Sequence, residues 1–256
     1  GVDNNVLYVL CLLAAMALVL ARAATGSRPF LLTGLLAAVS LTAFTVGGSA
    51  DLLSALPLVA AWLWRERRWG ALALGVAVSV KQLAWPFAPF YLIQIIAQQG
   101  WREAARRAGL AGGLFAAVNA PFVVWDAQAW MLGVLTPLSE PMFPRGVGLV
   151  ALGTNGAAPL LSATTYLVLE AAAAVAVLAI AWRTRRTSPE LGVVLAMVPL
   201  YFAWRSLFSY FFLLPLFAFA GLARMPAGEL SAEAARESGA LTIIAMPAPP
   251  QPAAPK

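Results

Sequence analysis

Three basic residues stand apart in this sequence because each lies away from the basic clusters that separate its apolar segments. They are Lys81, Arg145 and Arg205. A Lys or Arg at the centre of a membrane helix costs about 2.5–3.5 kcal/mol, so a cation beside a long apolar segment needs a compensating role. Lysine and arginine are the usual electrostatic clamp on phosphate. The three residues therefore predict contacts to an anionic substrate at the mouth of a cavity.

Each of these cations also has a simpler explanation. Lys81 is flanked by apolar residues on both sides, and its side chain could extend to the membrane surface. Arg205 could anchor a tight turn between two apolar segments, and Arg145 could pair with Glu140. With these alternatives left open, we predict a substrate-binding group of Lys81, Gln82, Arg145, Arg205 and Tyr210.

Two acidic residues are candidates for proton chemistry. Asp51 follows a small-residue turn at the end of an apolar segment, where it could cap a helix N-terminus. It could equally face the same cavity, positioning a hydroxyl or acting as a base, and we take it as the catalytic candidate. Glu170 lies well inside an apolar segment. A neutral acid bonded to a neighbouring helix explains it better than a proton-coupled group, because no other acid recurs in the nearby segments.

Several classes of chemistry are excluded. The chain has no histidine, which removes histidine acid–base catalysis, Ser-His triads and histidine metal sites, and its single cysteine, Cys11, lies in an apolar run. It contains no Walker loop, dinucleotide glycine fingerprint or nucleophile elbow. We expect no cofactor. A need for a divalent metal stays open, with Asp51 and Glu140 as the candidate external oxygen ligands.

Composition indicates an integral membrane protein. Hydrophobic residues make up 61% of the 256 and charged residues 11%, whereas soluble domains average about 25% charged residues. Mean hydropathy is +0.81. The net charge of +6 comes from clusters at the ends of apolar segments, which is a topology signal. Without a basic stripe interleaved with aromatics, we expect no nucleic-acid partner.

The elements that must position these residues are apolar segments, which run over 6–21, 29–47, 52–64, 70–97, 108–125, 161–182, 190–204 and 207–223. A helical crossing needs about 20 residues. The 70–97 segment would be about 42 Å long as one helix, more than the roughly 30 Å hydrocarbon core. It also contains Pro86 and Pro89, which a helix interior tolerates poorly. We predict a hairpin of two short helices with Lys81 and Gln82 near its tip.

The distribution of charge favours that hairpin. With it, only the three isolated cations lie on one side, and the other side carries Arg22, Arg28, Arg65, Arg67, Arg68, Arg102, Arg106, Arg107, Arg183, Arg185, Arg186 and Arg224. We predict an all-α polytopic transmembrane bundle, 1–224, of about nine helical segments with an external N-terminus and a cytosolic C-terminus. Residues 126–160 read as a non-helical external loop, and 225–256 as a disordered Ala/Pro-rich tail.

Residues 47–92 combine a small-residue turn ending in an acid, an apolar segment, a basic cluster, and a G-x-A-x-x-x-K sequence followed by prolines. This pattern resembles polytopic glycosyltransferases of the GT-C class, especially actinobacterial mannosyltransferases of the cell envelope. Residues 137–152 and 205–216 are similar to the external loop and final segment of such proteins. The matching positions are Gly47 to Asp51, Arg65 to Arg68, Gly75, Lys81, Pro86 and Pro89.

The resemblance implies an enzyme of the bacterial plasma membrane. It would transfer a sugar from a polyprenyl-phosphate donor to a glycan or glycolipid acceptor on the external face, among membrane lipids, by inverting displacement. A carboxylate would activate the acceptor and cations would stabilise the leaving phosphate. The catalytic acid of this class usually lies in the first external loop. Because the chain begins Gly-Val-Asp, we expect a C-terminal portion whose true base could lie upstream of Gly1.

A transporter or flippase of a lipid-linked or anionic substrate is the main alternative. It predicts paired halves or inverted repeats and recurring polar residues at mid-membrane, and the sequence has neither. A non-catalytic membrane scaffold is a further alternative, in which the external cations would matter for expression alone.

Overall fold

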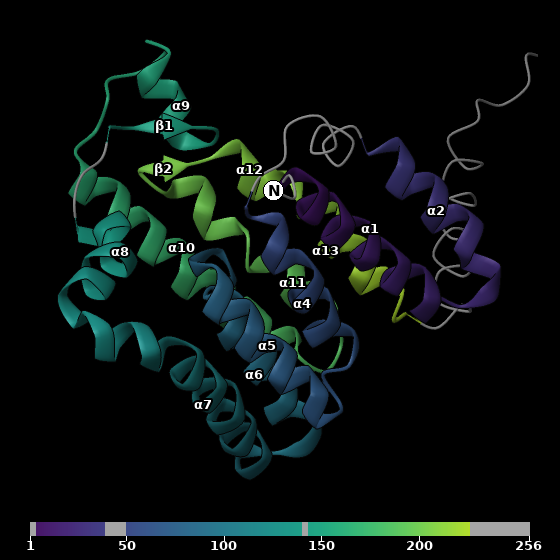
Figure 1. Ribbon diagram of the computed structural model, residues 1–256. Coiled ribbons are helices and arrows are strands. Elements are labelled where there is room, and N and C mark those ends of the chain that lie inside the picture. The colour runs from purple at the N-terminus through teal and green to yellow at the C-terminus, as the bar shows by residue number, and fades with distance from the viewer. Residues whose placement is uncertain (1–3, 39–49, 140–142, 226–256) are drawn as a thin grey trace, which may run out of the picture. The chain divides into compact units, whose positions relative to one another are not determined.

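The computed structural model describes residues 4–38, 50–139 and 143–225, and these are mostly helical (Figure 1). The two strands, β1 (Arg145–Gly146) and β2 (Arg205–Ser206), have two residues each. Three 3-10 turns are η1 (Thr25–Ser27), η2 (Gln82–Ala84) and η3 (Val198–Phe202). The α-helices are α1 (Asn4–Arg22), α2 (Arg28–Ala37), α4 (Leu52–Leu63), α5 (Arg68–Val80), α6 (Phe87–Gln99), α7 (Trp101–Trp125), α8 (Ala127–Ser139), α9 (Leu149–Thr154), α10 (Ala163–Thr184), α11 (Leu191–Leu195), α12 (Phe208–Phe212) and α13 (Leu214–Leu222).

Among the described residues, α1, α7 and α10 are long and apolar enough to cross a membrane. Shorter apolar helices include α4, α5, and the segments Leu191–Phe202 and Phe208–Leu222. The predicted helical class is therefore confirmed, and the three long apolar helices support a membrane protein. The predicted number of nine segments is not established. The second half of the 29–47 segment and the 225–256 tail beyond Met225 lie outside the described residues.

The predicted break within 70–97 is present. Helix α5 ends at Val80, Lys81 has extended backbone angles (φ −151°, ψ 136°), and Pro86 precedes the first residue of α6. Gln99, the last residue of α6, donates from Nε2 to the Glu66 carbonyl at 3.3 Å. Since Glu66 lies just before α5, the chain returns to the end at which α5 begins, as a hairpin requires.

Helix α4 lies at the centre of the packing, between α1 and α5, and α5 packs in turn on α7. Its residues Leu52, Ala55 and Val59, spaced to share one helical face, are fully buried. Glycine allows the close contacts of α5: a Cβ at Gly70 would lie 2.6 Å from the Trp64 carbonyl oxygen, and one at Gly75 would lie 2.9 Å from that of Ala111. Small residues thus let backbones approach, as in other membrane helix pairs.

The prediction that 126–160 is non-helical was wrong, because α8 and α9 lie within it. Helix α8 begins at a cap, in which Asp126 Oδ1 accepts from the Ala129 amide at 2.8 Å. It is joined to α7 by a bond from Trp130 Nε1 to Asn119 Oδ1 at 2.9 Å. Proline and glycine content suggested a loop, and this cap with its side-chain contact outweighs that composition. Which side of a membrane this region faces stays a prediction.

Candidate functional site

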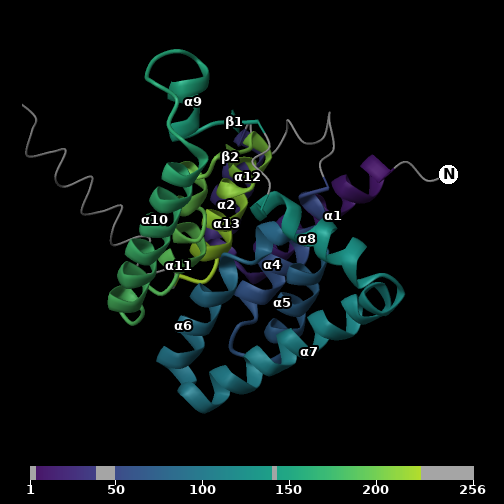
Figure 2. The same ribbon diagram turned by 90° about the vertical axis from the view of Figure 1, so that its left-hand side faces the viewer.

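The charges that the sequence divides into two groups lie at opposite ends of α4 and α5. Asp51 directly precedes α4 and Lys81 directly follows α5, whereas Arg65 and Arg67 lie in the turn that joins the two helices. Helices of 12 and 13 residues separate these ends by about 18–20 Å. Figures 1 and 2 agree that β1 and β2 lie at the end opposite the α6–α7 connection. We call the first end, with Asp51 and Lys81, the polar site.

Asp51 and Lys81 form an ion pair, with Lys81 Nζ 3.1 Å from Asp51 Oδ1. Asp51 is 4% exposed, while the Lys81 side chain is 39% exposed. Asp51 occupies the N-cap position of α4 without a side-chain capping bond, so the helix-cap alternative does not describe it. The buried carboxylate instead holds the lysine in place, and Lys81 keeps part of its surface open.

Arg145 and Arg205, which are 60 positions apart in the sequence, are partners in a parallel β-bridge. Paired residues on neighbouring strands project to the same face, so the two cations share one side. The Arg205 guanidinium also lies 5.7 Å from the centre of the Phe143 ring, a cation–π contact. The structure thus brings together two of the predicted substrate-binding cations.

Glycine residues allow the backbones of the two bridged segments to lie close together. Gly146 has φ +134°, and a Cβ there would lie 1.8 Å from the Ser206 carbonyl oxygen. That oxygen accepts from the Val147 amide at 2.7 Å. Gly148 has φ +81°, and a Cβ there would lie 2.4 Å from the Tyr201 carbonyl oxygen. The two glycines in Arg145-Gly-Val-Gly therefore allow the backbone of this sequence to pack directly against the segment that contains Arg205.

Tyr210 and Glu170 complete the polar site. Tyr210 interacts electrostatically with Asp51, Arg205 and Glu170. Tyr166 of α10 packs against Trp204, with ring centres 5.5 Å apart, and Glu170 lies one turn further along the same face of α10. The site predicted from the sequence does not include Glu170. Its spacing from a large aromatic residue was the available signal, but nothing in the sequence shows that this face meets the segment before Arg205.

Gln82 has a tethering contact in this structure. Its Nε2 donates to the Val134 carbonyl of α8, which ties α8 to the turn after Lys81. Its predicted role in substrate binding stays a prediction. Glu140, the predicted partner of Arg145, lies outside the described residues.

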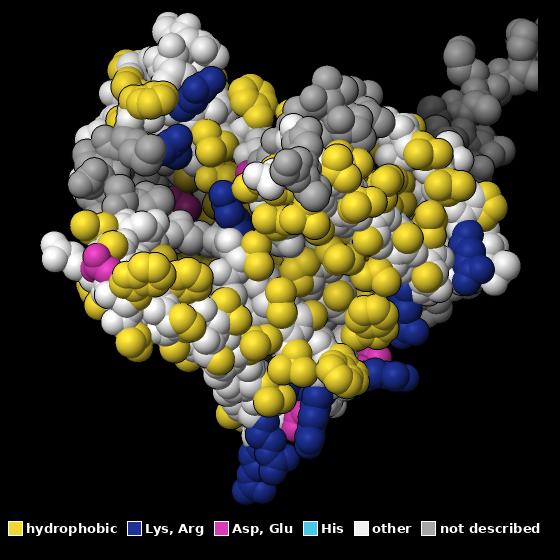
Figure 3. Space-filling model, in the orientation of Figure 1, with side chains coloured by type: hydrophobic (Ala, Val, Ile, Leu, Met, Phe, Trp, Pro, Cys, Tyr) yellow, Lys and Arg dark blue, Asp and Glu magenta, His cyan; other side chains and the backbone are white. Residues whose placement is uncertain are grey.

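The polar site has the chemical character of an anion-binding recess. Figure 3 shows basic and acidic side chains gathered around a hollow beside the strand region. Three cations can neutralise a phosphate, a phenol can donate to it, and a carboxylate can take up a proton. No group of three or more potential metal ligands occurs within residues 4–38, 50–139 and 143–225.

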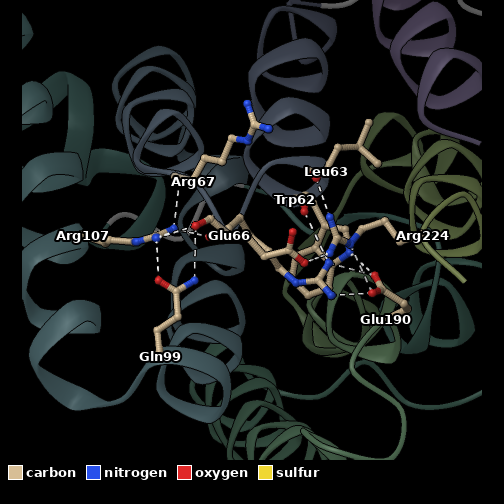
Figure 4. A network of polar contacts seen from close by, with 9 residues as sticks. Trp62, Leu63, Glu66, Arg67, Gln99, Arg107, Glu190 and Arg224 are labelled. Atoms are coloured by element: carbon tan, nitrogen blue, oxygen red, sulfur yellow. Dashed lines mark hydrogen bonds and ion pairs between the residues drawn. The ribbon is translucent and has the colours of Figure 1, made fainter.

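The opposite end of α4 carries a network of bonded charges, which we call the basic-end network (Figure 4). Glu190, just before α11, accepts from Trp62 Nε1 at 2.8 Å and from Arg65 Nη1 at 3.0 Å. Arg224, after α13, donates from Nε to Glu190 at 3.3 Å and from Nη1 to the Leu63 carbonyl at 2.5 Å. The network therefore joins the ends of three apolar segments.

Arg107 forms a second part of the network. It is 2% exposed and donates to the Arg67 carbonyl at 2.9 Å, the Glu66 carbonyl at 2.8 Å and Gln99 Oε1 at 2.7 Å. Burial would raise the pKa of the Glu66 carboxyl, but the charge and hydrogen bond of Arg224 outweigh it and lower that pKa. These buried arginines hold the turns of the bundle together.

Comparison with protein-family models, curated proteins and solved structures gives no match.

Proposed function

We propose that the protein is part of a membrane glycosyltransferase that uses a polyprenyl-phosphate sugar donor. One observation carries the proposal. The cations Lys81, Arg145 and Arg205, separated by 60 residues or more along the chain, converge with Asp51 and Tyr210 at one end of the bundle. Cations gathered beside apolar helices suit a substrate that has both a phosphate and a long apolar tail.

In the proposed reaction, an acceptor hydroxyl oxygen attacks the anomeric carbon of the donor sugar. The new carbon–oxygen bond forms as the bond from that carbon to the phosphate oxygen breaks, and polyprenyl phosphate leaves with the bonding electrons. The hydroxyl proton passes to a carboxylate. Lys81, Arg145 and Arg205 would stabilise the charge that develops on the leaving phosphate.

Asp51 keeps its predicted role as the carboxylate of this step. Its ion pair with Lys81 means that the carboxylate must first be released before it can accept the proton. A donor phosphate would compete with Asp51 for Lys81, because both are anions within reach of one ammonium group. Binding of the donor would then loosen the pair at 3.1 Å and make the Asp51 carboxylate available. Asp51 would thus be held inactive until the donor is in place.

The test is sugar transfer from a radiolabelled polyprenyl-phosphate hexose or pentose in membranes that contain the full-length protein. We expect transfer by wild type and its loss in Lys81→Ala and Arg205→Ala. Arg186→Ala, an exposed arginine in the turn after α10, is the matched control and should retain transfer. Absence of transfer with every donor, at normal expression, would contradict the proposal.

Carriage of a lipid-linked anion is the second candidate, and Glu170 favours it. A half-buried carboxylate in a candidate membrane helix is the kind of group that proton-coupled transporters use. Movement of an intact lipid-linked sugar across proteoliposomes, without transfer of its sugar, would support this candidate. Loss of that flux in Glu170→Gln would identify the carboxylate as the coupling group.

A further inference from the structure

A groove of about 520 Å³ runs between α4 and α5 near the turn that joins them. It is separate from the polar site, since its charged end is at the turn joining the helices. Its walls are Ala60 of α4, Trp64 directly after that helix, and Trp69, Leu72, Ala73 and Val76 of α5, with Arg67 in the turn between them. This volume is within the usual 300–1,000 Å³ range of ligand sites in proteins.

The spacing of the lining residues makes the groove a continuous stripe. Ala60 and Trp64 are four residues apart, and Trp69, Ala73 and Val76 follow at intervals of four and three, so each set occupies one helical face. The stripe on α5 extends about 10 Å from Trp69 to Val76. Small alanine side chains on both helices leave the space that bulky residues would fill.

Arg67 gives the groove one charged end. It is the only charged residue in the lining. Nothing in the described part of the chain hydrogen-bonds or ion-pairs with its guanidinium, and Figure 4 shows its side chain directed away from the network. Arg65 and Arg107, by contrast, are 1% and 2% exposed and bound within the network. The turn therefore presents Arg67 outward while it buries Arg65.

Two tryptophans mark the level of this charged end. Trp64 and Trp69 are 37% and 70% exposed and both line the groove beside Arg67. Tryptophan is enriched where membrane helices meet the headgroup region. The two tryptophans therefore favour headgroup depth for Arg67, and the alanine and valine positions further along α4 and α5 would then lie at the depth of acyl chains.

We propose that this groove is a binding site for an anionic phospholipid. One acyl chain would lie along Ala60, Ala73 and Val76, and the phosphate would contact Arg67. Charge complementarity selects an anionic lipid, because Arg67 is the cation available at the groove and basic residues at helix ends attract anionic headgroups. This proposal is independent of the proposed glycosyltransferase function, since it uses no residue of the polar site.

The experiment is native mass spectrometry of the full-length protein in detergent, titrated with phosphatidylglycerol or with phosphatidylcholine. Wild type should bind phosphatidylglycerol more tightly. Arg67→Gln should lower its affinity for phosphatidylglycerol by about fivefold and weaken phosphatidylcholine binding less, because choline offsets the charge of that phosphate. Ala73→Phe should fill the groove and reduce binding of both lipids. The controls are Arg102→Gln, an exposed arginine at the start of α7, and Ala116→Phe, an exposed alanine on α7.

Two results would overturn the proposal. One is an unchanged preference for phosphatidylglycerol in Arg67→Gln, and the other is the wild-type number of bound lipids in Ala73→Phe. Each variant is first compared with wild type by gel filtration and circular dichroism. If Ala73→Phe fails to fold, Val76→Trp replaces it, because Val76 is 41% exposed and a larger side chain there has room to lie in the groove.

Discussion

The two ends of α4 use charge in opposite ways. At the basic-end network, Arg65 and Arg107 are almost completely buried and their donors are directed at carbonyls and carboxylates of the protein. At the polar site, Lys81 is partly exposed and Arg145 is exposed. The comparison indicates that the first set stabilises the bundle, and that the second is available to a ligand. Variants at the two ends should therefore differ in which property they change.

The largest expected effect is on stability at the network. Glu190→Gln removes the carboxylate that Trp62, Arg65 and Arg224 share, and it leaves Arg65 buried without its counter-charge. Breaking a buried ion pair in this way costs about 3–5 kcal/mol. Thermal unfolding in detergent should show a clear loss of stability. The control Glu103→Gln changes a carboxylate that also binds a buried arginine, Arg107, but Arg107 keeps its carbonyl partners, so its loss should be smaller. Equal losses would contradict this account of the network.

At the polar site the expected effect is on activity. Arg205→Ala removes one of the cations proposed to stabilise the leaving phosphate, and loss of one such electrostatic contact lowers turnover about 10²–10³-fold. Its unfolding temperature should stay near that of wild type, because the β1–β2 bridge is made by backbone groups. Turnover of the proposed transfer and thermal unfolding are measured on the same preparation. Normal turnover, or loss of the folded structure, would contradict the claim that the polar site acts in activity and the basic-end network in stability.

A glycine variant tests whether the two arginines must be together. Gly146→Ala would place a Cβ 1.8 Å from the Ser206 carbonyl oxygen, so β1 and β2 should separate. Turnover should then fall about tenfold or more, because a loss of about 1.4 kcal/mol of transition-state stabilisation lowers a rate tenfold. Gly156→Ala is the matched control: Gly156 also has positive φ, at +75°, but nothing lies within 4 Å of an added Cβ. A similar loss in both variants would show that backbone strain, rather than the position of Arg145, is responsible.

The smallest effect is on the pH dependence of stability. The pKa of Glu66 is lowered in the folded protein, mainly by Arg224 acting against burial. A carboxyl with a depressed pKa stabilises the fold above its unfolded pKa of about 4.3, and that contribution disappears as pH falls through the lower folded value. Glu66 is half exposed, so solvent screens the pair and the effect is modest. Unfolding temperatures between pH 6 and pH 3 should fall less steeply in Glu66→Gln, and identical slopes would exclude this contribution.

Some of this organisation was predictable because charge and proline act locally. Pro86 and Pro89, with Lys81 before them, identified the break between α5 and α6, and the return of α6 to Glu66 agrees with it. Four of the arginines predicted to share one side, Arg65, Arg67, Arg107 and Arg224, meet in the basic-end network, and the side of a membrane that they face stays a prediction. In these cases the positions of proline and charge along the sequence and the tertiary contacts indicate the same arrangement.

Other features depend on contacts that no local pattern records. The pairing of Arg145 with Arg205 rests on a backbone bridge between distant segments, although the glycines at 146 and 148 were a visible sign of close approach. Glu170 joined the site because Tyr166 packs on Trp204. Helix α8 was not predicted because no local pattern records the bond from Trp130 to Asn119 of α7. Tertiary contacts decided each case.

The most direct test of the central claim is turnover of a polyprenyl-phosphate sugar by wild type, Lys81→Ala and Glu190→Gln, each normalised to folded protein. We predict that the folded fraction of Lys81→Ala is inactive, and that the folded fraction of Glu190→Gln transfers sugar at the wild-type rate. Transfer by Lys81→Ala at the wild-type rate would contradict the claim that the polar site binds the donor phosphate.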